Sequence, residues 1–119
     1  MFRMSLRIVF YKEDGEWVAR CLEFNLVGTG KTKLQAAKRL AEAIDCQMHA
    51  TIRHRNPENL FHPADGKYFS MFAAGKDIAV AAFQLKLEKI EKELEGGYDF
   101  HDISAREVLP TRRRQVVFA

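Results

Sequence analysis

The first apolar pattern along the chain is an alternation that begins a few residues after the start. One set of positions is Leu6, Ile8 and Phe10, and the other is Arg7, Val9 and Tyr11. A period of two is typical of a half-buried strand. Asp14-Gly15 then supplies a turn signal, and Trp17, Ala19 and Cys21 share one face of the next segment. The pattern predicts a β-hairpin, and residues 25–28 are expected to add a third short strand.

A helix start follows two closely spaced glycines. Gly28 and Gly30 can adopt positive φ, as a chain that leaves the edge of a sheet often must. Thr32, with Gln35 three residues later, has the form of a capping box, in which the two residues satisfy each other's hydrogen bonds. The helix is therefore predicted to begin at Lys33.

This helix carries one apolar stripe with steps of three and four residues. The stripe consists of Leu34, Ala37, Ala41, Ile44, Met48 and Ile52. The charged residues that lie off the stripe are Lys33, Lys38, Arg39 and Glu42. Such spacing places the apolar side chains on the face that packs against a sheet. Because a proline at position 57 disfavours helical backbone in the residue before it, we expect the helix to end by about Arg55.

The carboxy-terminal half has a less distinct pattern. Residues 67–74, followed by Gly75, fit a short helix, although a strand through the same residues is the alternative. Residues 78–94 fit both a strand and a helix by periodicity. A sheet of three strands beside one helix would leave an edge open, so we favour a strand over residues 79–88. Residues 115–118 are a candidate for a further short edge strand.

The totals indicate one globular domain. The chain has 119 residues, of which 47% are hydrophobic and 29% are charged. We assign residues 1–109 to an α+β domain with a carboxy-terminal extension and residues 110–119 to a basic tail. No apolar run approaches the roughly 20 residues that a membrane span needs, and the first residues lack the apolar core of an export signal. We therefore expect a cytoplasmic protein with no membrane partner, in which Cys21 and Cys46 are buried thiols.

The sequence offers no pattern of residues that catalysis or a cofactor would require. Its histidines, at positions 49, 54, 62 and 101, have no cysteine or acid at the spacing of a metal site. The segment 28–32 lacks the spacing of a phosphate-binding loop. Glu16 and Glu23 are the only acids expected to approach each other on the sheet, and two acids are too few for a two-metal nuclease. We therefore predict no catalytic, metal-binding or cofactor-binding residue and no cofactor.

Several of these features occur together in one known family. They are Tyr11 on the first strand, Trp17 with Ala19 on the second, Gly30 with Thr32, and the small residues Ala36, Ala37 and Ala43 beside Leu40 and Ile44 in the helix. In this pattern residues 6–52 resemble the HicB-like family, the antitoxin half of the HicA–HicB toxin–antitoxin pairs. The resemblance implies a partial ribonuclease-H-like fold, with a small antiparallel sheet in the order β-β-β-α-β. It also implies a non-enzymatic function, in which the protein covers the active site of a small basic RNA-cleaving HicA-like toxin.

The distribution of charge supplies candidate contact residues. Residues 88–107 contain seven acids and three bases, a net charge of minus four that suits a basic partner. The candidate partner-binding acids are Glu88, Glu91, Glu93, Glu95, Asp99 and Asp102. The alternative hypothesis is a nucleic-acid-binding module that uses the basic tail and the polar face of the helix. Its candidate residues are Arg112, Arg113, Arg114, Lys33, Lys38 and Arg39.

We also predict a homodimer. Residues 79–88 and 115–118 are rich in apolar side chains for a short chain with limited interior, and closed two-fold dimers are the commonest assembly. Deletion of residues 110–119 should therefore weaken the dimer. Light scattering of the intact chain at tens of micromolar checks this prediction, which a monomeric mass would contradict. A dimer insensitive to the deletion would place the contact on the hairpin or the helix.

Overall fold

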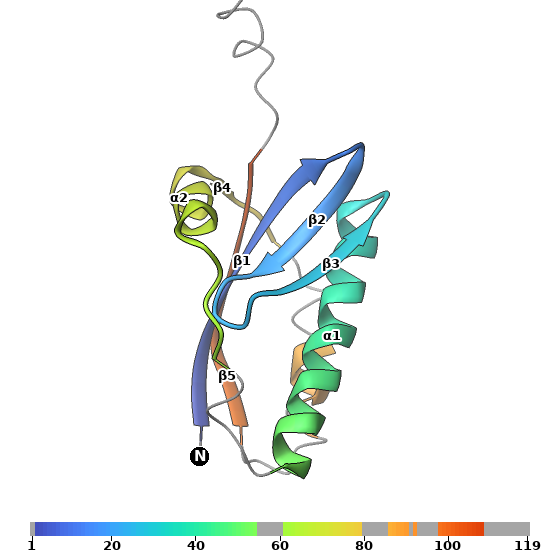
Figure 1. Cartoon of the computed structure of the whole chain (residues 1–119), viewed down its shortest axis with the longest axis vertical. Coiled ribbons are helices and arrows are strands. Elements are labelled where there is room, and N and C mark those ends of the chain that lie inside the picture. The colour runs from blue at the N-terminus through green and yellow to red at the C-terminus, as the bar shows by residue number, and fades with distance from the viewer. Residues whose placement is uncertain (1, 55–60, 80–85, 91, 93–97, 109–119) are drawn as a thin grey trace, which may run out of the picture.

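The computed structural model describes residues 2–54, 61–79, 86–90, 92 and 98–108 (Figure 1). Its strands are β1 (Phe2–Glu13), β2 (Glu16–Cys21), β3 (Leu26–Gly30), β4 (Lys76–Asp77) and β5 (Tyr98–Glu107). Its named helices are α1 (Lys33–Arg53) and α2 (Gly66–Ala74), and residues 86–90 are also helical. None of the helices in these ranges has the length and apolar character that a membrane crossing requires.

The five strands form one mixed sheet in the order β3-β2-β1-β5-β4. The α+β class is confirmed, but the prediction of a purely antiparallel sheet is wrong, because β5 runs parallel to β1. Strand β3 runs in the same direction as β1, and the long helix α1 then carries the chain back along the sheet. The chain next forms α2 and β4, and β4 runs antiparallel to β5. Strand β5 therefore returns in the direction of β1 after β4 rather than directly after α1.

The predicted hairpin is confirmed. Strands β1 and β2 pair from Ile8↔Cys21 to Glu13↔Glu16, which leaves a turn of two residues. Asp14 and Gly15 occupy that turn with φ of 52° and 80°. Positive φ at both central residues is the requirement of the tight hairpin turns that match the twist of the strands. The third strand is also present, although it begins at Leu26 rather than at residue 25.

Helix α1 begins at Lys33 as predicted, and Thr32 caps it. The Thr32 hydroxyl accepts a hydrogen bond of 3.0 Å from the backbone N–H of Gln35. The positive φ expected at Gly28 is not found, because Gly15 is the glycine with positive φ in the described residues. Gly28 is instead a point of close approach: an added Cβ would lie 2.2 Å from the backbone N of Leu40 and 2.3 Å from the carbonyl O of Ala36. The helix backbone therefore rests directly on β3.

The predicted apolar stripe is partly correct. The buried positions of α1 are Ala36, Ala37, Leu40, Ala41, Ile44, Met48 and Thr51. Leu34 and Ile52, which the stripe included, are 66% and 39% exposed. They are the second and the second-to-last residues of the helix. The stripe is therefore buried along the middle of α1 and exposed at its two ends.

Apolar side chains cover both faces of the sheet. On the face that packs against α1 the core includes Leu6, Ile8 and Phe10, and Leu87 and Ile90 complete it from residues 86–90. On the opposite face the buried residues are Val9, Tyr11, Val18, Leu22, Ala64 and Phe72. Phe72 belongs to α2, so the predicted second helix is confirmed and its strand alternative is wrong.

The strand predicted over residues 79–88 is wrong where the structure describes it. Residue 79 is irregular and residues 86–88 are helical. The helical alternative is correct for residues 86–88, because Leu87 and Ile90, three residues apart, are both buried on one side. The strands that follow α1 in the sheet are β4 and β5, and neither was predicted from the sequence. Residues 80–85 and the candidate strand 115–118 lie outside the described residues.

The close approach at Gly28 predicts a sharp cost for a single methyl group. Gly28→Ala should lose at least about 3 kcal/mol of unfolding free energy, because overpacking against a helix backbone cannot be relieved by a side-chain rotation. Gly66→Ala is the matched control, since nothing lies within 4 Å of its added Cβ. Urea denaturation of both variants measures the difference. Equal midpoints would contradict the direct contact between α1 and β3.

Candidate partner-binding surface

The candidate acidic residues are divided between two elements. Glu88 is exposed in the helical residues 86–90, and Asp102 is exposed on β5. Asp99 also belongs to β5, although its side chain is not described. Glu91, Glu93 and Glu95 lie outside the described residues. The segment that reads as one acidic stretch in the sequence is therefore a helix and a strand in the fold.

Other acids are neutralised within the protein. Glu23 accepts a 2.7 Å bond from Arg7, Glu107 accepts one of 2.7 Å from Lys33, and Asp77 accepts one of 3.0 Å from Arg106. The side chains of Glu88 and Asp102 make no hydrogen bond or ion pair with another described residue. Their charge is therefore available to a partner.

Strand β5 is paired along one side and only partly along the other. On the β1 side its pairing runs from Phe2↔Tyr98 to Phe10↔Glu107. On the outer side, within the described residues, β4 pairs only with Arg106 and Glu107. One more hydrogen bond, of 3.0 Å, joins the N–H of Ile78 to the carbonyl of Ala105. In the described part of the chain, the outer edge of β5 before Ala105 is thus an open sheet edge.

The opposite edge of the sheet, β3, is short and is covered by a basic side chain. It has five residues, and Arg39 of α1 donates a 2.9 Å hydrogen bond to the carbonyl of Thr29. Short edges and basic side chains are common protections against pairing with another chain. Arg39, a candidate for nucleic-acid contact, therefore already has a partner in the protein.

The other nucleic-acid candidates do not gather into one site in the described residues. Lys33 is engaged by Glu107 at 2.7 Å and lies 5.3 Å from the centre of the Trp17 ring. Lys38 is exposed on α1. Arg112, Arg113 and Arg114 lie outside the described residues.

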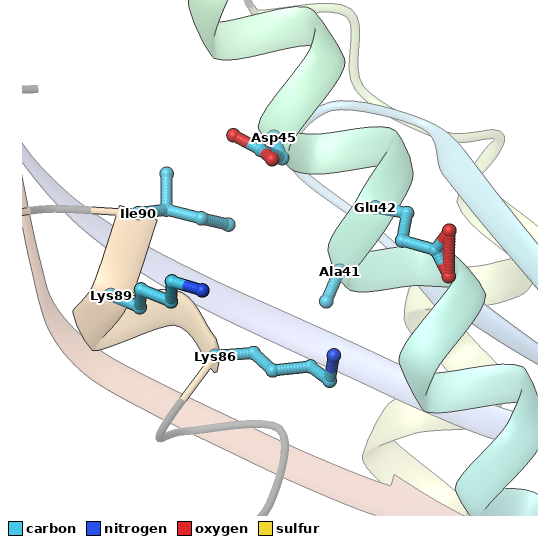
Figure 2. Close-up of a pocket in the computed structure, with 6 residues that line it drawn as sticks. All are labelled: Ala41, Glu42, Asp45, Lys86, Lys89 and Ile90. Atoms are coloured by element: carbon cyan, nitrogen blue, oxygen red, sulfur yellow. The ribbon is translucent and has the colours of Figure 1, made fainter. Parts of the chain in front are cut away.

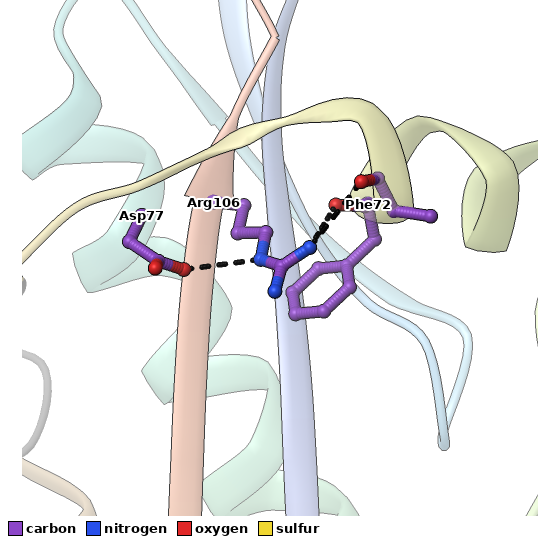
Figure 3. A network of polar contacts seen from close by, with 4 residues as sticks. Phe72, Asp77 and Arg106 are labelled. Carbon is purple, nitrogen blue, oxygen red and sulfur yellow. Dashed lines mark hydrogen bonds and ion pairs between the residues drawn. The ribbon is translucent and has the colours of Figure 1, made fainter.

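Three arginines on adjacent strands form contacts that the sequence analysis missed. Each stacks its guanidinium on one aromatic ring of α2: Arg7 on Phe69 at 4.8 Å, Arg20 on Tyr68 at 4.0 Å, and Arg106 on Phe72 at 4.6 Å. Figure 3 shows Arg106 between Asp77 and α2, where it also donates a 3.0 Å hydrogen bond to the carbonyl of Phe72. Two features of the sequence could have indicated these contacts. One is an arginine at alternating positions of a predicted strand, and the other is a set of aromatic residues at helical spacing in a separate segment.

Two hydrogen bonds fix the position of Arg20 beside Tyr68. Arg20 donates to the hydroxyl of Tyr11 at 3.1 Å and to the side-chain carbonyl of Asn25 at 2.8 Å. The Tyr11 ring stacks on Tyr68 with 5.9 Å between ring centres. Burial raises the pKa of Tyr11, and the Arg20 charge opposes that shift only in part. These contacts satisfy the arginines internally, so their role is to attach α2 to the sheet.

The acids and histidines considered for catalysis do not converge. Glu16 begins β2 and Glu23 follows its end, so at about 3.3 Å per residue they lie roughly 20 Å apart, and the expected approach is wrong. His49 lies 2.9 Å from the carboxylate of Asp45 on the same helix. Within the described ranges, no group of three or more His, Cys, Asp or Glu side chains is placed to hold a metal ion.

A small hollow lies between α1 and residues 86–90, with a volume of about 110 Å³. Its lining residues are Ala41, Glu42, Asp45, Lys86, Lys89 and Ile90. Figure 2 shows both lysine side chains extending toward α1. The hollow has room for a few water molecules, and its mixed charges have no preferred ligand sign.

A wider depression, of about 440 Å³, lies at the start of α1. Its basic residues, Lys31 and Arg39, suit an anion, but nearby backbone donors already have partners. The N–H of Lys31 donates to the side chain of Gln35 at 2.8 Å, and the N–H of Gln35 donates to Thr32. The helix start is thus satisfied internally at these two donors.

Comparison of the chain with protein-family models, with curated proteins and with solved structures found no match.

The two cysteines are predicted to differ in reactivity. Cys21 is fully buried, and burial raises the pKa of its thiol to about 12, whereas Cys46 is exposed, contrary to the expectation from sequence. Because the thiolate is the reactive form, iodoacetamide at pH 8 should label Cys46 in the folded protein and Cys21 only in denaturant. Mass spectrometry of the labelled peptides measures both. Equal labelling rates in the folded protein would contradict the burial of Cys21.

Proposed function

We propose that this chain is a HicB-like antitoxin-type protein, a non-enzymatic domain that binds and neutralises a small basic RNA-cleaving toxin. The sequence resemblance over residues 6–52 motivates the proposal. The fold supports it in outline, because a hairpin, a third strand and a long helix are followed by a later strand, β5, of the same sheet. Helix α2 and strand β4 stand between α1 and that strand.

The observation that carries the proposal is the unneutralised charge of Glu88 and Asp102. Both side chains are exposed and make no ion pair with a described residue, whereas Glu23, Asp77 and Glu107 are held by internal bases. Exposed acidic side chains attract a basic protein and orient it on approach, which raises the association rate, and here Glu88 and Asp102 belong to opposite sides of the sheet. Affinity then comes from apolar and main-chain contacts that binding buries.

Nucleic-acid binding is the alternative, and the described geometry supports it less. Of the candidate basic residues on α1, Lys33 and Arg39 already donate within the protein, and Lys38 is exposed. This alternative predicts binding to RNA or duplex DNA that weakens steeply with salt, by about one log-log unit for each phosphate contact. Loss of that binding in the Arg112, Arg113 and Arg114 alanine variant would favour it.

The proposal is tested by co-expression with the small basic protein encoded beside this chain's gene. We expect a complex that survives purification and restores the growth that the partner alone suppresses. The double variant Glu88→Lys and Asp102→Lys should weaken the complex at least tenfold, because it places like charges opposite the partner. Isothermal titration calorimetry measures the change.

The matched control reverses two exposed acids at the far end of the hairpin, Glu13→Lys and Glu16→Lys, which changes the net charge by the same amount. We expect this variant to bind within about twofold of the unaltered chain, because remote surface charges contribute little. Absence of any complex would overturn the proposed function. Equal weakening by both double variants would show that total charge, rather than the charge of Glu88 and Asp102, determines binding.

A further inference from the structure

We propose that the basic partner binds by adding a β-strand to the open outer edge of β5. This inference rests on the proposed function and specifies how the same surface is used. Strand addition pairs an extended segment of one protein with an unpaired sheet edge of another, and main-chain hydrogen bonds supply much of the affinity.

The direction of the main-chain groups on β5 is fixed by two hydrogen bonds. The N–H of Val108 donates to the carbonyl of Phe10 at 2.8 Å, so the even-numbered position 108 faces β1. The carbonyl of Ala105 accepts from Ile78 at 3.0 Å, so this odd-numbered position faces outward. Because main-chain groups alternate along a strand, Ile103 also directs its N–H and carbonyl outward. These groups are the donor and acceptor that an added strand would use.

Among the described residues, the chain supplies only the beginning of such a strand. Strand β4 consists of Lys76 and Asp77, both exposed, and Asp77 accepts a hydrogen bond from Arg106. Within the described ranges, the next contact with β5 is the hydrogen bond of Ile78. An added strand therefore continues the row that β4 starts and lies beside residues 102–104.

The negative charge of Asp102 determines which kind of strand can pair with this edge. A second copy of the same chain would place Asp102 near another Asp102 in an antiparallel pair, and like charges on facing strands are destabilising. A basic strand would place its cations there instead. The other edge, β3, is a poorer site, because Arg39 occupies the carbonyl of Thr29 and repels a basic segment.

The side chains of β5 alternate between the two faces of the sheet, and this alternation defines the sequence that the partner strand needs. Ile103 packs against the core on the α1 side of the sheet, whereas Asp102 is exposed on the α2 side. Neighbouring strands place their side chains beside each other on the same face. The partner strand should therefore alternate basic residues, beside Asp102, with apolar residues, beside Ile103.

The test uses the full chain labelled with nitrogen-15 and an eight-residue peptide of alternating lysine and valine. Amide hydrogen exchange is measured by NMR with and without the peptide at low salt. We expect the exchange of the Ile103 amide to slow at least tenfold, and we expect the Asp102→Lys variant to lose most of that protection. A peptide of alternating glutamate and valine is the control and should have no effect.

An unchanged Ile103 amide, or protection of the β3 amides instead, would overturn the inference. The same measurement on the complex with the basic protein encoded beside this chain's gene tests the strand-addition inference separately from the proposed function. A complex that leaves Ile103 unprotected would defeat strand addition and leave the antitoxin proposal standing. Protection by the peptide together with no complex would support the edge and defeat the antitoxin proposal.

Discussion

Strand β1 is the constraint on which the rest of this structure depends. It pairs antiparallel with β2 on one side and parallel with β5 on the other, and Ile8, Val9 and Phe10 are fully buried. Residues 8–11 form a continuous apolar run because both faces of the strand are covered, as in the interior strands of larger sheets. Helix α1 covers one face and α2 covers the other.

Different interactions attach the two helices to the sheet. Helix α1 is attached by close packing, since its backbone rests on Gly28 and its buried face includes the small residues Ala36, Ala37 and Ala41. Helix α2 is attached by arginine–aromatic stacking with β2, β1 and β5, at about 0.5–1 kcal/mol for each exposed pair. The first attachment depends on the absence of a single Cβ, whereas the second is shared among three partly independent contacts.

Local signals made the amino-terminal half predictable from sequence. The Asp14-Gly15 turn and the Thr32 cap act within a few residues, so their effect does not depend on the rest of the fold. Strand β5 was missed because its pairing with β1 shifts register between Met4 and Ser5, and His101 is the extra residue. The shift places Phe100 and Ile103 in the same core although they are three residues apart in the sequence. The two-residue alternation that would identify a strand is therefore hidden. The acids were recognised as a group, but their division between helix and strand depends on long-range pairing that no local pattern encodes.

The unequal edges of the sheet have a consequence for assembly size. A sheet with two open edges can pair with itself repeatedly, as in fibrils, because each added strand presents a new edge. Here Arg39 occupies a main-chain acceptor at the β3 edge, so strand pairing is disfavoured on that side. Strand pairing with this chain would therefore be confined to the β5 side, so each chain would offer one edge and could not link two other chains into a longer sheet.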